Sequence, residues 1–100
     1  MKDIRMEDIA RLHDILMKSS KTVIVTHMKP DGDATGSSAA MYHFLKACCN
    51  ADIKVVLNDR FQHVLNFLAE GDIAEDICIF SEDSAAASKA VSEADTIICL

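Results

Sequence analysis

A short polar stretch from Thr26 to Ser38 carries the residues whose types and spacing could do chemistry. His27 lies four residues before Asp31, and a second carboxylate, Asp33, follows two residues later. Two carboxylates in close quarters repel each other unless a cation or a proton lies between them. Mixed imidazole and carboxylate ligation suits Mn²⁺ or a similar borderline metal better than Ca²⁺. The stretch therefore predicts a divalent metal site.

Two neighbouring ions fit this stretch. Residues i and i+2 of an extended turn point to opposite sides, so the two aspartates can serve different ions. We therefore expect His27 and Asp31 to bind one ion and Asp33 to bind the second. Pro-Asp-Gly-Asp is also a common hydrophilic turn. The imidazole before it and the glycine-serine helix start after it favour the metal site.

The residues after the aspartates predict a place for a phosphate group. Gly36 lets a ligand approach the first turn of the next helix closely. Ser37 lies among the amides of Thr35 to Ser38, which are expected to be unpaired helix-start donors. Arg60, at the start of a later helix, could meet a phosphate oxygen, although a solvated arginine is the commoner arrangement. Gly36, Ser37 and Arg60 are the expected substrate contacts.

The periodicity of apolar residues predicts the elements that position this stretch. Residues 22–26 form a β-branched run typical of a buried strand, and the apolar spacing after it predicts a helix over 35–49. Further helices are expected at 3–18, between Asp59 and Gly71, and at 84–93, with further strands at 53–57, 77–80 and 96–100. This alternation predicts an α/β fold, a three-layer Rossmann-like parallel sheet with helices on both faces. In such a sheet, ligands bind at the carboxyl ends of the strands.

Composition narrows the function classes. The chain has 100 residues, enough for one small domain, with 10 basic and 16 acidic residues and a net charge of −6. This charge argues against a basic surface that grips long duplex DNA, because such affinity comes from Lys and Arg at phosphates. No apolar stretch approaches the length of a membrane span, roughly 18 residues. A small phosphate ligand is compatible with the negative net charge, since bound metal ions would supply positive charge locally.

The cysteines and the remaining histidines are expected to be structural or solvated. The four cysteines form no C-x-x-C pair, which favours buried free thiols and a reducing, cytoplasmic compartment: Cys48, Cys49, Cys78 and Cys99. Cys78 and Cys99 are expected in neighbouring strands. His13 and His43 are expected at the surface or partly buried, and for His63 a place near substrate stays open.

The sequence from His27 to Ser37, H-M-K-P-D-G-D-A-T-G-S, resembles the first motif of the DHH phosphoesterase superfamily, H-x-x-P-D-x-D-A-x-G-S. All seven fixed positions agree. This form is similar to the branch that contains oligoribonuclease/pAp phosphatases and cyclic-dinucleotide phosphodiesterases. The layout through Asn58 to Phe61 and the Phe67-Leu68 helix is also similar, so the resemblance extends over essentially the whole chain.

The resemblance implies a role for each metal residue and a longer protein. By resemblance, His27, Asp31 and Asp33 bind two Mn²⁺ ions, with Mg²⁺ or Co²⁺ as alternatives. Further aspartates, the Asp-His-His motif and a C-terminal substrate-binding domain complete the site in that family, and none of them is in this chain. Residues 1–100 are therefore expected to be the N-terminal part of a DHH domain, ending at Leu100 where the second-motif aspartate would follow. This part alone is expected to be inactive.

The function implied by the resemblance is metal-dependent hydrolysis of nanoRNA, pAp, or linear or cyclic dinucleotides by a two-metal hydroxide mechanism. One alternative is a phosphoanhydride hydrolase, similar to pyrophosphatases or exopolyphosphatases. An alternative of another class is a non-catalytic nucleotide-binding module. The oligomeric state stays open, with a homodimer of the full-length protein as the candidate assembly.

Overall fold

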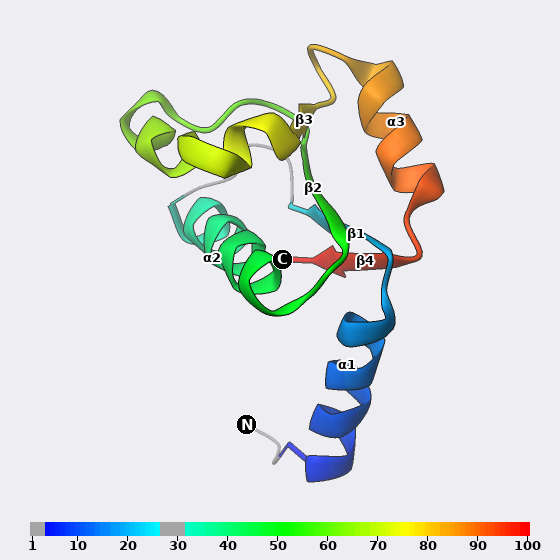
Figure 1. Cartoon of the computed structure of the whole chain (residues 1–100). Coiled ribbons are helices and arrows are strands. Elements are labelled where there is room, and N and C mark those ends of the chain that lie inside the picture. The colour runs from blue at the N-terminus through cyan, green and yellow to red at the C-terminus, as the bar shows by residue number, and fades with distance from the viewer. Residues whose placement is uncertain (1–3, 27–31) are drawn as a thin grey trace.

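The computed structural model describes residues 4–26 and 32–100 (Figure 1). Helices and strands alternate along the chain as the sequence predicts. In chain order they are α1 (Met6–Lys18), β1 (Lys21–Val25), α2 (Gly32–Cys48), β2 (Asp52–Leu57), the 3-10 helices η1 (His63–Ala69) and η2 (Gly71–Asp76), β3 (Ile77–Ile79), α3 (Ser84–Glu93) and β4 (Thr96–Cys99).

The four strands form one parallel sheet in the order β3-β2-β1-β4. Ile24 of β1 is in register with Val55 of β2 on one side and with Ile98 of β4 on the other. The chain builds the sheet from β1 through β2 to β3, and then crosses back to place β4 beside β1. The strand order therefore reverses between β1 and β4, and open α/β sheets bind ligands at such a switch point.

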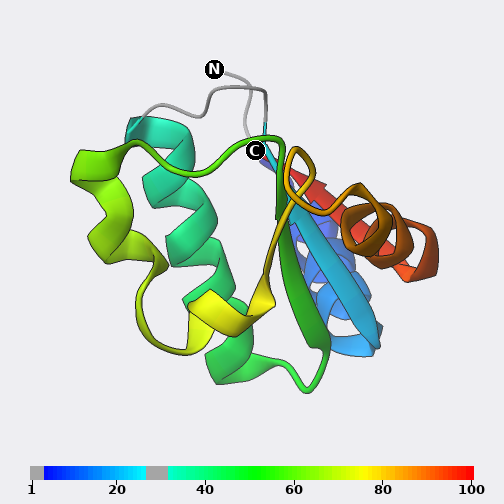
Figure 2. The same ribbon diagram turned by 90° about the horizontal axis from the view of Figure 1, so that it is seen from above.

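Helices cover both faces of the sheet, which confirms the predicted α/β class. Figure 2 shows α2 with the two 3-10 helices on one side of the sheet and α3 on the other. The core lies mainly under α2 and is built from alternate residues of β2 with apolar residues of the neighbouring elements: Ile24, Tyr42, Leu45, Ile53, Val55, Leu57 and Ile73. Alternate β2 residues reach this core because successive side chains of a strand point to opposite faces.

The predicted third helix is the part of the fold that was wrong. The segment forms two 3-10 helices, η1 and η2, in place of one α-helix. No capping box forms at the start of this segment: the Asp59 carboxylate accepts a hydrogen bond from the Asn58 side chain (2.8 Å), and Gln62 makes no side-chain cap. The apolar residues Phe61 and Val64 have the spacing of one helix face, but only Phe61 is buried, while Val64 is 75% exposed. Gly71, with φ of 85°, divides the two helices in the left-handed conformation that glycine tolerates.

The expectation of buried thiols was also wrong. All four cysteines are free, but Cys48 and Cys99 are exposed, and Cys49 and Cys78 are half-buried. Cys78 and Cys99 do not lie in neighbouring strands, because β3 and β4 are at opposite edges of the sheet. Apolar neighbours in sequence indicated burial for Cys99, but none of the described residues pairs with the outer side of its edge strand.

A partly buried ionic junction joins α2 and β2 to Asp76, the residue just before β3. The Asp76 carboxylate accepts hydrogen bonds from the hydroxyl of Tyr42 and from Nζ of Lys54, the latter at 3.0 Å, while Nζ of Lys46 lies 3.6 Å away. Burial opposes ionisation of Asp76, but these hydrogen bonds outweigh it and hold its pKa below the ordinary value. Burial and the same carboxylate raise the pKa of Tyr42. The junction fixes the 3-10 segment against α2.

Replacing Asp76 with asparagine should lower the free energy of unfolding at pH 7 by about 2 kcal/mol, because charge-assisted hydrogen bonds at a mostly buried group are lost. The folded pKa of Asp76 is depressed, so its contribution is present above the unfolded value, 3.8, and is lost as the pH falls below it. The wild-type and mutant stabilities should therefore converge in acid. Urea unfolding from pH 7 to pH 2 measures this, with Asp14→Asn on the exposed surface of α1 as the control.

A second polar junction holds the amino ends of β1 and β4 together. The Asp95 carboxylate accepts hydrogen bonds from the hydroxyls of Ser19 (2.5 Å) and Ser20 (2.9 Å) and from the Ser20 amide (2.8 Å). The hydrogen bond from Ser19 and those from Ser20 lower the pKa of Asp95. This contact holds the amino ends of β1 and β4 together. The polar stretch from Thr26 to Ser38, called the metal stretch below, follows β1 at the opposite end of the strand.

Candidate metal centre at the carboxyl ends of the strands

The predicted metal stretch joins the end of β1 to the start of α2, at the switch point of the sheet. His27 and Asp31 lie outside the described residues, so their roles as ligands stay predictions. The two ends of the stretch are fixed, since β1 ends at Val25 and α2 begins at Gly32. The backbone amide of Leu100, just after β4, donates to the Val25 carbonyl at 3.0 Å. The carboxyl end of β4 is therefore next to the metal stretch.

Asp33 lies in the first turn of α2 with an exposed side chain, while the next two residues, Ala34 and Thr35, are buried. Its carboxylate is thus on the solvent side of the helix start, at the carboxyl edge of the sheet. The expectation of an extended turn through Asp33 was wrong, because the helix begins one residue earlier, at Gly32. The alternation of side chains in an extended turn therefore no longer supports the assignment of Asp31 and Asp33 to different ions. That assignment stays a prediction. Among the described residues, no three acidic, histidine or cysteine side chains form a metal-binding group.

The backbone amides expected to bind phosphate, those of Thr35 to Ser38, are not the first amides of the helix in the structure. The helix begins three residues before the predicted position, so Gly36 and Ser37 lie in its second turn. Amides there bond the preceding turn and are not the free helix-start donors. Ser37 is exposed, and among the described residues no atom outside the adjacent helix backbone lies within 4 Å of the place where a Cβ on Gly36 would be. The contact of both residues with substrate stays a prediction.

The buried hydroxyl of Thr35 fits a polar site at this position. Thr35 is fully buried, and its Oγ1 has no hydrogen-bond partner in the part of the chain that the structure describes. The hydroxyl of Ser38, one turn later, donates to the Ala34 carbonyl at 2.7 Å. Buried hydroxyls are normally paired, because an unpaired one costs about 1–3 kcal/mol. An unpaired hydroxyl in the first turn of α2, close in sequence to Asp33, is consistent with a bound polar group there. The donor set itself fits Mn²⁺.

A pocket of about 280 Å³ opens beside the metal stretch, at the carboxyl ends of β1, β2 and β3. It is lined by Val25, Thr26, Val56, Leu57, Asn58 and Phe80. Asn58 and Phe80 were not among the predicted site residues. Each directly follows a strand, and their position at strand ends was the signal that could have identified them.

Arg60 is engaged by an acidic partner. Its guanidinium contacts the Glu82 carboxylate through Nε (2.5 Å) and Nη2 (2.7 Å), which raises the pKa of Arg60. The Arg60 side chain is 72% exposed, so this pair is a surface ion pair that solvent screens. A phosphate would have to compete with Glu82 for the guanidinium. His13, His43 and His63 are all exposed.

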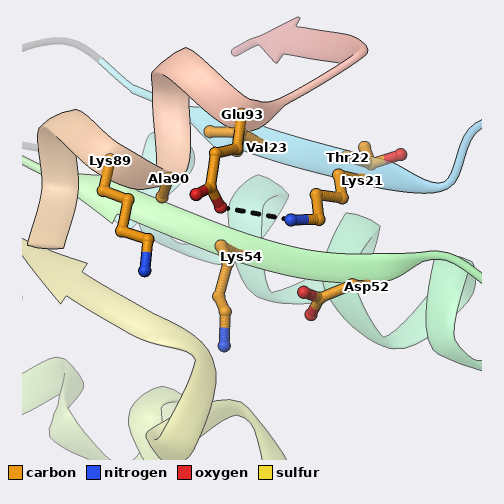
Figure 3. A pocket seen from close by; sticks show the side chains of 8 residues that line it. All are labelled: Lys21, Thr22, Val23, Asp52, Lys54, Lys89, Ala90 and Glu93. Carbon is orange, nitrogen blue, oxygen red and sulfur yellow. Dashed lines mark hydrogen bonds and ion pairs between the residues drawn. The ribbon is translucent and has the colours of Figure 1, made fainter.

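Two other hollows lie away from the metal stretch. One, of about 190 Å³, is between α3 and the amino ends of β1 and β2 (Figure 3). Three of its lining residues are lysines. Lys21 pairs with Glu93 at 3.1 Å and Lys54 pairs with Asp76, so among the described residues Lys89 is the one lysine of this hollow without an ion pair. The second is an apolar groove of about 360 Å³ between α1 and α2, lined by residues such as Leu12, Met41 and Phe44.

Within the described residues, no helix is both long enough and apolar enough to cross a bilayer.

Comparisons with known proteins agree with the motif. The model of the DHH family, N-terminal domain, matches residues 21–100. The crystal structure of an exopolyphosphatase-related protein from Bacteroides fragilis is similar, with 34% sequence identity and a TM-score of 0.82. That match covers 100% of this chain and 28% of the Bacteroides chain, so this chain spans less than a third of that protein. No curated protein matches the chain.

Proposed function

Since the chain belongs to the DHH family, we propose that it is the N-terminal part of a Mn²⁺-dependent phosphoesterase. The substrates we propose are short oligonucleotides or nucleotide phosphates, as in the oligoribonuclease/pAp phosphatase branch. His27 and Asp31 would hold one ion, and Asp33 the other. Mg²⁺ or Co²⁺ could replace Mn²⁺ at such oxygen and nitrogen ligands.

One observation carries this proposal most directly. The stretch with the three metal residues joins β1 to α2 at the point where the strand order reverses, and β4 ends beside it, with the Leu100 amide on the Val25 carbonyl. A ligand from the chain that follows β4 would therefore lie next to the same stretch. Two parallel strands that are adjacent in the sheet, β1 and β4, can in this way supply both halves of one metal centre.

Residues at the start of α2 would contribute a ligand and a hydrogen-bonding group to the metal centre. Asp33, exposed at the start of α2, presents its carboxylate to the carboxyl edge of the sheet. The hydroxyl of Thr35, buried without a partner among the described residues, would donate to or accept from a polar group in the site. Bound divalent ions would lower the pKa of water and neutralise the charge of the phosphoryl group. Two carboxylates and an imidazole suffice for half of such a centre, which is why residues 1–100 alone are proposed to be inactive.

Phosphoanhydride cleavage is the second candidate function, and the name of the Bacteroides protein favours it. The pocket beside the metal stretch favours the nucleotide substrate, since none of its six lining residues is a cation that would hold a chain of inorganic phosphates. A non-catalytic nucleotide-binding module would keep the fold without the later ligands. We also propose a cytoplasmic location, since the four thiols are free.

A turnover screen of the full-length protein with Mn²⁺ tests the proposal. The substrates are a short RNA, pAp, a linear dinucleotide, a cyclic dinucleotide and pyrophosphate. We expect hydrolysis of at least one nucleotide substrate, abolished by a chelator and restored by Mn²⁺. Turnover of pyrophosphate alone would support the phosphoanhydride hydrolase, and no turnover of any of the five would support the binding module.

A further inference from the structure

The pocket beside the metal stretch has the chemistry of a site for a flat, weakly polar group. Three of its six lining residues are aliphatic, one is aromatic and two are uncharged polar residues: Val25, Val56 and Leu57, then Phe80, then Thr26 and Asn58. None carries a positive charge. A phosphate group would find no cation there, whereas a nucleobase would find apolar walls, an aromatic face and an amide.

Phe80 is an exposed aromatic ring on a fixed turn. Its side chain is 47% exposed, although phenylalanine is usually buried. Its backbone amide donates to the Leu57 carbonyl at 2.7 Å, and the Ser81 amide donates to the Asn58 carbonyl at 3.0 Å. The backbone amide of Asp83 donates a hydrogen bond to the Ile79 carbonyl at 2.8 Å, which closes the turn. The ring is therefore held at the ends of β2 and β3 by backbone contacts, so little backbone ordering is needed for a base to stack on it.

Asn58 supplies the polar part of the pocket. Its Nδ2 donates to the Asp59 carboxylate at 2.8 Å, which orients the carboxamide. The backbone of Asn58 is tied to the turn that carries Phe80 through the Ser81 amide. The carboxamide and the ring thus belong to one connected unit at the edge of the sheet. An amide can donate to and accept from the edge of a base.

We propose that Phe80 and Asn58 form a nucleobase subsite, in which a base of the substrate stacks on the Phe80 ring. This inference rests on the proposed function and adds the residues that would hold the base of such a nucleotide substrate. Stacking of a base on an aromatic side chain is tolerant of base identity. The subsite therefore selects nucleotides over inorganic phosphates without selecting one base.

The test compares two substrates in the full-length, Mn²⁺-loaded protein. One is the diadenylate pApA, and the other is the same sugar-phosphate dimer with both bases absent. Phe80→Ala should lower kcat/KM for pApA by about 10-fold to 100-fold, the usual range for loss of one stacked base. It should leave kcat/KM for the abasic dimer and the bound metal content unchanged. Phe80→Trp should retain cleavage of pApA. Phe44→Ala, at an exposed ring in the groove between α1 and α2, is the matched control and should change neither substrate.

The outcomes separate this inference from the proposed function. If Phe80→Ala lowers kcat/KM equally for both substrates, or for neither, the base subsite is wrong while the nucleotide phosphoesterase stands. If the wild-type protein cleaves pyrophosphate but neither pApA nor any other of the nucleotide substrates, both the proposed function and the subsite are wrong. If it cleaves pAp but not pApA, the subsite for a base of a dinucleotide is wrong while the nucleotide phosphoesterase stands.

Discussion

Replacing Asp33 with alanine in the full-length protein is expected to lower phosphoesterase turnover by about 1,000-fold or more. A metal ion contributes several kcal/mol of charge stabilisation in the transition state, and about 4 kcal/mol corresponds to that factor. One of the two metal positions should be empty, while the other keeps its ion. Metal content per protein molecule and kcat, both measured with Mn²⁺ in excess, check this result.

The fold should survive this substitution, which separates a ligand from a structural turn residue. Asp33 lies in the first turn of α2, where a carboxylate is worth about 0.3–1 kcal/mol against the helix dipole. Its removal also relieves repulsion from Asp31. The two effects oppose each other, so the melting temperature without metal should change by less than about 4 °C. Asp8→Ala, in the exposed first turn of α1, is the matched control and should change neither metal content nor turnover. Full metal occupancy in Asp33→Ala, or a melting temperature that falls sharply, would contradict the ligand role.

Residues 1–100 alone are expected to show no detectable phosphoesterase activity and only weak Mn²⁺ binding. The full-length protein is expected to bind two ions and to hydrolyse its substrate. The physical reason is the number of ligands. This part of the chain offers His27, Asp31 and Asp33, and two divalent ions need more donors than three side chains supply. Isothermal titration with Mn²⁺ and a turnover assay on both proteins measure the difference.

Circular dichroism must show that the isolated chain is folded under the assay conditions, so that inactivity reports missing ligands and not unfolding. Folded residues 1–100 that hydrolyse substrate at a rate close to that of the full-length protein would show that the half-site account is wrong.

The sheet could be predicted from sequence because its signals are local and strong. Runs such as residues 22–26 and 53–57 are apolar enough to be buried on both faces, and such strands occur mainly in parallel sheets. The order of the strands needed the structure. Nothing in the local pattern of Cys99 shows that its strand crosses back beside β1 and not beside β3, and that error led to the wrong neighbour for Cys78.

The segment between Asp59 and Gly71 shows where periodicity fails. Its apolar residues have helical spacing, but Val64 and Phe67 face solvent and the chain forms a 3-10 helix. Tertiary contacts at Phe61 and Ile73 decide how this segment packs on α2, and propensity alone does not contain them.

The candidate site was predictable only in part, because residue types indicate the metal-binding residues but not the residues that the fold brings beside them. The residue types from His27 to Asp33 specify their chemistry wherever the fold places them, and the DHH family match confirms the family that the motif indicated. Asn58 and Phe80 belong to the site region only because two further strands end beside the motif. An asparagine and a phenylalanine have no signature of their own, so only the register of β2 and β3 brings them to the same pocket.

The most direct test of the two-metal account is anomalous diffraction from crystals of the full-length protein grown with Mn²⁺, measured at the manganese absorption edge. The account predicts two anomalous peaks about 3.5–4 Å apart at the carboxyl end of β1. One should be bonded to His27 and Asp31, and the other to Asp33. A single peak elsewhere, or no peak within bonding distance of these three side chains, would contradict it.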